Sequence, residues 1–409
     1  MYRLINVGLR GLTLLSKFLL IFFLAKFLAA DAVGLYGLLS AGIGYGIYVL
    51  GCEFYNFANR ELIGSERSAW LRLIRDQAVL YVLLYMLFLP VLVGVFWRGW
   101  LPWAFFSWFL LLLLLEHIAQ EANRILVATS QQLLASVVLF LRSGLWCLVV
   151  VLLMWGSQEA RTLEVTLAAW VLGCLVACGV ALYSFSHMDK SELRLPIDWA
   201  WIRRGVVAAL PLLVASLAVR GIYTFDRYWV EHVASLHVLG AYVLYIGMAT
   251  AILSFLDAGV VVFFFPKLVQ AAKQKQGVLF EKVMRELAVN VGLVVVVLSF
   301  CCWLSSFWIV QWLNQPVYQE NIALLYWLLG ATSLYGLSMV PHLGLYAYGE
   351  DKQILYAQVF GLLVFIGVAY FAADWGAVSV AWAMTSAFLV VLAWKTFAYH
   401  KLQKRIRAF

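Results

Sequence analysis

The chain has 409 residues, of which 65% are apolar and only 12% are charged, with a mean hydropathy of +0.92. Soluble globular proteins contain about 45–50% apolar and about 25% charged residues. This composition excludes a soluble enzyme, a disordered chain and a secreted disulfide scaffold, because too little polar surface is left to cover a core. The apolar residues form long blocks and do not alternate over ten-residue strands, so they predict an all-α polytopic membrane protein.

Twelve transmembrane helices are predicted, since a bilayer core about 30 Å thick requires about 20 apolar residues per helix. The predicted spans are 8–29, 33–58, 77–97, 103–125, 134–155, 165–186, 205–225, 238–264, 287–313, 322–347, 354–373 and 377–398. All connections are short, and the longest one expected on the outer side is 226–237. No extramembrane catalytic domain is therefore expected.

The distribution of Lys and Arg predicts the orientation. Twenty-one of the 29 lie in the connections and termini of one side, with Lys395 counted in the C-terminal tail, and three (Arg98, Arg161 and Arg227) lie on the other side. Cytoplasmic loops carry such an excess, so both termini are predicted to be cytoplasmic. The net charge of +8 is thereby explained without a nucleic-acid partner. The six cysteines all fall in apolar blocks and show no metal-site spacing, so no metal or cofactor is predicted.

An internal duplication divides the chain into two halves. The second span opens with Gly34-Leu35-Tyr36-Gly37-Leu38 and the eighth with Gly240-Ala241-Tyr242-Val243-Leu244, both of the form G-x-Y-x-L and 206 residues apart. Six helices per half give a parallel repeat, so we expect two six-helix lobes related by a pseudo-two-fold axis. The expected domains are lobes at 1–187 and 205–398, a linker at 188–204 and a basic tail at 399–409. Such lobes are typical of transporters that alternate between inward-open and outward-open states. Three prolines fall inside spans, namely Pro90, Pro211 and Pro341. Each either produces a helix kink that serves this motion or produces a kink that serves only the packing of the helices.

Five basic residues fall inside predicted spans, where a charge usually faces a cavity or a partner. Arg10 and Lys17 are two turns apart on the first span and so share a face, while Arg142 and Arg220 lie on the fifth and seventh spans. These four predict a cationic cavity for an anionic substrate. The alternatives are that Arg10 snorkels to the interface, as we expect of Lys26, and that Arg142 and Arg220 form structural ion pairs.

Acidic and aromatic residues accompany these cations. Glu53 and Asp257 have no oppositely charged neighbour in the sequence, and they either pair with the cavity cations or carry a coupling proton or sodium ion. Glu116 and Glu121 lie in a polar stripe on the fourth span, where Glu121 is spaced to pair with Arg124. Tyr45 and Tyr48 lie deep in a Gly-rich stretch and are candidates for stacking on a sugar.

The sequence resembles the Wzx-type polysaccharide (O-antigen repeat-unit) flippases of the multidrug/oligosaccharidyl-lipid/polysaccharide exporter superfamily. The resemblance is carried by scattered positions along the whole chain. They are Gly34-x-Tyr36, Asn59-Arg60 closing the second span, Ala209-Leu210-Pro211, Asp226-Arg227, Leu239-Gly240-Ala241-Tyr242, Phe265-Pro266-Lys267 closing the eighth span, and Leu345-Tyr346-Ala347. It implies a flippase of the bacterial inner membrane that moves an undecaprenyl-pyrophosphate-linked oligosaccharide by ion-gradient antiport. It also implies a polysaccharide polymerase and a chain-length regulator as partners.

Two other functions fit parts of the sequence. A cation-coupled multidrug exporter of the same superfamily would favour an acidic cavity, whereas the intramembrane charges here include five bases. A membrane polymerase or glycosyltransferase that uses a polyprenyl-linked sugar would require a substantial outer loop, which this chain lacks. Transport of a lipid-linked glycan is therefore the favoured function.

Overall fold

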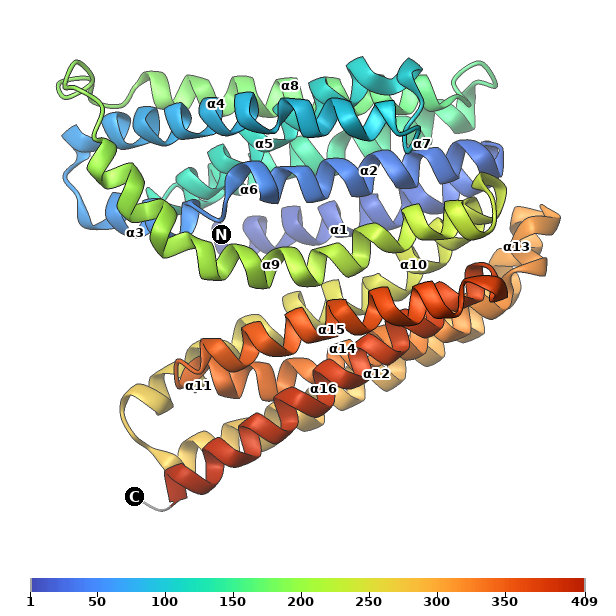
Figure 1. Ribbon diagram of the computed structural model, residues 1–409. Coiled ribbons are helices and arrows are strands. Elements are labelled where there is room, and N and C mark those ends of the chain that lie inside the picture. Colours follow the sequence, from blue (N-terminus) through green and yellow to red (C-terminus); the bar gives the residue numbers. More distant parts are fainter. Residues whose placement is uncertain (1, 408–409) are drawn as a thin grey trace. The chain divides into compact units, whose positions relative to one another are not determined.

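The computed structural model describes residues 2–407, and this part of the chain consists of helices and their connections, without a β-strand (Figure 1). The elements of the first half of the chain are α1 (Tyr2–Phe27), α2 (Ala30–Gly51), α3 (Tyr55–Gly64), α4 (Arg67–Trp97), η1 (Trp103–Phe105), α5 (Phe106–Ala128), α6 (Gln132–Phe140), η2 (Leu141–Leu145), α7 (Trp146–Gly156) and α8 (Leu163–Ser186). Those of the second half are α9 (Trp199–Val233), α10 (Leu236–Leu256), η3 (Asp257–Val261), α11 (Val262–Lys273), α12 (Gly277–Leu313), α13 (Pro316–Glu320), α14 (Ile322–Ala347), α15 (Asp351–Phe371), η4 (Ala373–Trp375) and α16 (Ala377–Arg407).

Within residues 2–407, twelve helical segments are long and apolar enough to cross a membrane, which confirms the predicted fold class. Helices satisfy their own backbone hydrogen bonds, as a chain in hydrocarbon must. The tenth span ends at Ala347, as the sequence predicts, and the fourth ends at Ala128, three residues beyond its predicted end at 125. Pro90, Pro211 and Pro341 all lie inside helices.

Three predicted boundaries are wrong. The second span does not continue to residue 58 but ends at Gly51, and Asn59 and Arg60 belong to the separate helix α3. The eighth span does not close at Phe265-Pro266-Lys267, because the helix continues through Pro266 to Lys273. The expected outer connection 226–237 shrinks to two residues between α9 and α10. In each case polar residues that the sequence analysis placed at the end of a span or in a loop lie inside a helix. They are Asn59 and Arg60 in α3, Lys267 in α11, and Asp226 and Arg227 in α9.

Local departures from the α-helix follow the second span and interrupt the fifth and eighth spans. Cys52 and Glu53 adopt left-handed φ angles of 50° and 51° and so bend the chain between α2 and α3. The fifth span contains the π-helical turn η2, and the eighth contains η3, which begins at Asp257. Insertions of this kind are frequent at functional sites.

The chain forms two compact units. The first unit comprises the residues up to Leu28 together with Leu38–Leu217, and the second comprises Ala29–Gly37 together with the residues from Ala218 onward. The helices α2 and α9 therefore each contribute to both units. The sequence placed the division at a linker over 188–204, whereas α9 already begins at Trp199 and its first half belongs to the first unit.

In the first unit, the beginning of α9 packs on the bend after α2. The ring of Trp201 meets that of Phe54 edge-on with 5.2 Å between centroids, and Phe54 is fully buried. Gly205 lies so close to Phe54 and Phe57 that a Cβ atom there would overlap their rings. Aromatic packing thus fixes the bend that carries Glu53.

In the second unit, α14 and α15 both pack along α16, which continues as a helix to Arg407 (Figure 1). Gly361 of α15 allows close approach to Val391 of α16, and Gly344 of α14 does the same for Tyr399. The expected basic tail at 399–409 is therefore helical as far as Arg407. This continuous helix places Lys395 inside the unit.

Candidate functional site

Two of the basic residues of α1, Arg10 and Lys17, lie on an exposed face of the helix. Arg10 and Lys17 are exposed, while Thr13 and Ser16 between them are buried and donate hydrogen bonds to the carbonyls of Leu9 and Leu12. Among the side chains of residues 5–405, none forms an ion pair with Arg10 or Lys17. The positive charge of this face is thus uncompensated within the first unit.

Arg142 is held by a carboxylate. Its Nε lies 3.4 Å from Glu116 Oε2, and both side chains are only 11% exposed. The other oxygen of Glu116 accepts a hydrogen bond of 2.6 Å from Trp170 Nε1, and the Trp170 ring stacks on Trp146 with 5.5 Å between centroids. The structure therefore pairs Arg142 with Glu116, another predicted site residue. This is the structural ion pair that the sequence left open as the alternative to a role of Arg142 in the cavity.

Glu121 lies at the centre of a second buried network. Its Oε2 accepts hydrogen bonds from Gln77 Nε2 (2.9 Å) and Tyr81 OH (2.8 Å), and its Oε1 accepts one from Arg124. The expected Glu121–Arg124 ion pair is confirmed. The guanidinium carbon of Arg124 also lies 3.5 Å from the ring centroid of Tyr55, a cation–π geometry.

The two candidate sugar-stacking tyrosines lie on α2 beside this network. Tyr48 faces Arg124 with 5.6 Å between the guanidinium carbon and the ring centroid, and Tyr45 is half-buried. Tyr48 therefore already has a planar cation near its ring. Stacking of a sugar on either tyrosine stays a prediction.

Glu53 is buried at the bend after α2 and is engaged by neutral groups. Its Oε1 accepts a 2.5 Å hydrogen bond from Ser216 Oγ of α9, and its Oε2 accepts one of 2.7 Å from Asn56 Nδ2. Within the described part of the chain it forms no ion pair with a cation. The local partner Asn56 escaped the sequence analysis, which considered only charges.

In the second unit, Arg220 of α9 and Asp257 at the start of η3 are both exposed. Both lie near enough to Tyr335 of α14 to interact electrostatically with its hydroxyl. The predicted cation and the predicted acid of this unit thus act on the same tyrosine with opposite sign. Their roles in substrate binding and ion coupling stay predictions.

The sequence analysis missed one strongly unusual residue. Lys395 of α16 is 0% exposed, and its Nζ has no hydrogen-bond partner in the described part of the chain. The signal was present, because Lys395 interrupts an apolar run that begins at Ala377, but the residue was counted with the basic tail. His117 belongs to the polar stripe predicted on the fourth span but was not among the candidate site residues. It is buried, with its ring 4.6 Å from that of Tyr81 and its Nε2 without a partner.

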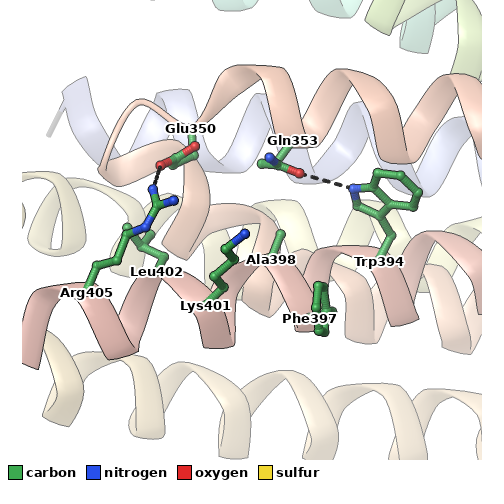
Figure 2. Close-up of a pocket in the computed structure, with 8 residues that line it drawn as sticks. All are labelled: Glu350, Gln353, Trp394, Phe397, Ala398, Lys401, Leu402 and Arg405. Atoms are coloured by element: carbon green, nitrogen blue, oxygen red, sulfur yellow. Dashed lines mark hydrogen bonds and ion pairs between the residues drawn. The ribbon is translucent and has the colours of Figure 1, made fainter.

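A surface cavity of about 210 Å³ lies near the C-terminal end of α16 (Figure 2). Figure 2 shows Arg405 reaching Glu350, with 3.8 Å between nitrogen and oxygen, and Trp394 donating a 3.3 Å hydrogen bond to Gln353. None of the predicted site residues lines this cavity. Residues 2–407 contain no cluster of three or more His, Cys, Asp or Glu residues placed to hold a metal ion.

Comparison with known proteins identifies the fold. No protein family and no curated protein matches the sequence. A solved multidrug resistance MATE family transporter of the MOP superfamily, in an inward-facing conformation, superposes with a TM-score of 0.78 at 13% identity over 99% of both chains. The chain has the fold of the MATE family transporters.

Two further structures of this fold agree. An outward-facing multidrug resistance MATE transporter gives a TM-score of 0.59 at 16% identity over 100% of this chain and 96% of that one. A MOP superfamily transporter from Pyrococcus furiosus gives 0.59 at 16% identity over 98% and 94%. The description of this Pyrococcus furiosus structure states that the reverse polarity of its binding pocket suggests a different function. The fold is thus shared by a protein whose binding pocket is described as reversed in polarity.

Proposed function

We propose that this chain is a transporter of the MOP superfamily that moves an anionic, lipid-linked oligosaccharide across the bacterial inner membrane. The observation that carries this proposal is the uncompensated positive face of α1. Arg10 and Lys17 are exposed without an ion pair, whereas all three acids of the first unit that were candidate site residues are engaged by the unit itself. A desolvated diphosphate is stabilised by such cations, and a cationic drug is repelled by them.

The fold supports transport rather than catalysis, since the structures that share it are transporters. One of them is described by a reverse polarity of its binding pocket that suggests a different function, and this supports a substrate other than a cationic drug for the present chain. The coupling ion of the proposal is a proton or a sodium ion. The polysaccharide polymerase, the chain-length regulator and the cytoplasmic placement of both termini remain part of the proposal.

The test is binding of a synthetic short-chain polyprenyl-pyrophosphate oligosaccharide to purified protein. Arg10→Ala and Lys17→Ala are each expected to weaken binding about tenfold, which corresponds to about 1.4 kcal/mol. Lys17→Arg retains the charge and should be milder. Lys404→Ala, which removes an exposed cation at the end of α16, serves as the control and should bind normally. Unchanged binding by both α1 alanine variants would exclude the cationic site.

A multidrug exporter is the second candidate, favoured by the TM-score of 0.78 to a multidrug resistance MATE transporter. Asp257 is the exposed acid that a cationic drug would require. In this case a cationic dye such as ethidium would be exported by whole cells, and Asp257→Asn would abolish the export. Loss of dye export in Asp257→Asn, together with normal export in Lys17→Ala, selects this candidate over the lipid-linked glycan.

A further inference from the structure

Lys395 lies in the interior of the second unit without a partner for its charge. Its side chain is 0% exposed, and its Nζ has no hydrogen-bond acceptor in the described structure. The helix that carries it, α16, packs along α14 and α15. Lysines are almost never fully buried unless they are paired, so this residue requires a functional explanation.

Two residues of α14 face this lysine. Its Nζ lies 5.6 Å from the ring centroid of Tyr335, and His342 lies close enough to interact electrostatically with it. Tyr335 and His342 are seven residues apart and therefore share one face of α14. The Nδ1 of His342 is also buried without a partner, and so is the hydroxyl of Tyr223, whose ring lies 6.1 Å from that of Tyr335. Three unpartnered polar atoms thus occupy one aromatic-lined interior.

The carboxylates of the second unit lie elsewhere. Asp257 and Arg220 approach Tyr335, but neither forms an ion pair or a hydrogen bond with Lys395. The other titratable groups on elements that pack against α16 are exposed or already bonded. The exposed ones are Tyr326 and Tyr346 of α14, Asp351, Lys352, Tyr356 and Tyr370 of α15, and Asp374 of η4. The bonded ones are His237 of α10, which pairs with Asp31, and Tyr242 and Tyr245 of α10, which donate to Asp226 and to the Tyr318 carbonyl.

Burial of an ammonium without a hydrogen-bond acceptor is costly, and an aromatic ring offsets only a part of that cost. Two protonated bases, Lys395 and His342, would in addition repel each other. The buried arrangement therefore favours the neutral amine, and a proton can be accommodated only when the interior opens to water or changes its packing. This is the property of a site that binds a proton in one conformation and releases it in another.

We propose that Lys395, with His342 beside it, is the proton-binding site that couples transport to a pH gradient. The proposal rests on the proposed transport function, and it deepens that function by assigning the coupling ion. The step is a proton transfer in which a hydronium ion gives its proton to the lone pair of Nζ and becomes water, and release reverses it. No other bond changes.

Protonation is measured directly by ¹⁵N NMR of the protein labelled at lysine Nζ and reconstituted in bilayers. We expect one lysine signal in the neutral-amine range at pH 7.5, which moves to the ammonium range as the pH falls. This signal should be missing in Lys395→Met and present in the matched control Lys401→Met, which removes an exposed lysine of the same helix. If Lys395→Met does not fold, Lys395→Arg, which stays protonated, serves for the assignment. Ammonium signals alone over pH 5–9 would overturn the proposal.

Coupling is measured in proteoliposomes with a fluorescent polyprenyl-pyrophosphate oligosaccharide. One pH unit is worth up to tenfold accumulation per coupled proton, and we expect the wild-type protein and Lys401→Met to show an accumulation of that order. Lys395→Met should exchange the probe without a gradient but should not accumulate it. Accumulation by Lys395→Met equal to that of Lys401→Met overturns the coupling role and leaves the proposed function intact. Failure of the wild-type protein to exchange the probe rejects the proposed function, while the NMR measurement still tests the proton site.

Discussion

Gly34 and Gly240 meet where α2 and α10 begin, and a Cβ atom on Gly34 would lie only 3.3 Å from the Gly240 amide nitrogen. A Cβ atom on Gly240 would in turn overlap the backbone of Ala30. Both glycines open a G-x-Y-x-L motif, and both belong to the second unit. Small residues allow membrane helices to approach closely, where dispersion contacts replace the missing hydrophobic drive. The duplicated motif therefore forms a tight helix crossing.

Substitution of Gly240 by alanine is expected to destabilise the second unit. The new methyl group would meet the Ala30 carbonyl, and backbone cannot move aside as a flexible side chain can. Overpacking of this kind costs about 1–3 kcal/mol. Thermal unfolding of the purified protein in detergent should show a lower Tm.

The matched control for this variant is Gly292→Ala on α12. A Cβ atom at Gly292 meets no atom within 4 Å, so this change has only the effect of a better helix former. Its Tm should be unchanged or slightly higher. An equal Tm for Gly240→Ala and Gly292→Ala would show that the crossing is not as tight as the structure has it.

Glu116→Gln is expected to destabilise the first unit more than the loss of a surface charge would. The amide still accepts from Trp170, but it leaves the guanidinium of Arg142 buried without a counter-charge. Removal of one partner from a buried pair costs about 3–5 kcal/mol. The double variant Glu116→Gln/Arg142→Met removes both charges and should recover a large part of the lost stability.

Glu159→Gln in the connection between α7 and α8 is the control, because Glu159 is exposed. Urea or thermal denaturation of the four proteins gives the comparison. The ion pair has no structural role if Glu116→Gln unfolds at the same temperature as Glu159→Gln.

The fold could be predicted because hydrocarbon permits few structures. Apolar length alone gives twelve helices, and it places the end of the tenth span at Ala347 and that of the fourth within three residues of Ala128. Bends could not be predicted in this way. The left-handed residues Cys52 and Glu53 are ordinary in sequence, and their conformation is imposed by the packing of Phe54 against Trp201.

The candidate site was predictable only where partners are near in sequence. The pair of Glu121 and Arg124 is one helical turn apart and was expected, whereas Glu116 reaches Trp170 across 54 residues. Lys395 shows the same limit. A basic residue near the end of a span looks like an interfacial residue, and only the packing of α14 along α16 shows that it is buried.

Cys52 reports on the charge of Glu53 at the bend. Burial and, second, the neighbouring Glu53 carboxylate raise the pKa of the Cys52 thiol. Since the thiolate is the reactive form, a raised pKa makes alkylation slow at neutral pH and keeps its rate rising into the alkaline range. In a variant with Cys52 as the sole cysteine, alkylation by iodoacetamide should therefore be slow at pH 7.5 and increase up to about tenfold per pH unit.

Glu53→Gln in this sole-cysteine protein removes the carboxylate that raises the pKa, so alkylation at a fixed pH of 8 should become faster. Glu61→Gln, an exposed position on the neighbouring α3, is the control and should leave the rate unchanged. A faster rate in Glu53→Gln alone means that Glu53 is ionised at the bend, because a protonated carboxyl would exert no such effect. Equal rates in both variants mean that Glu53 is held neutral beside Ser216 and Asn56, and a coupling ion would then have no charge to bind there.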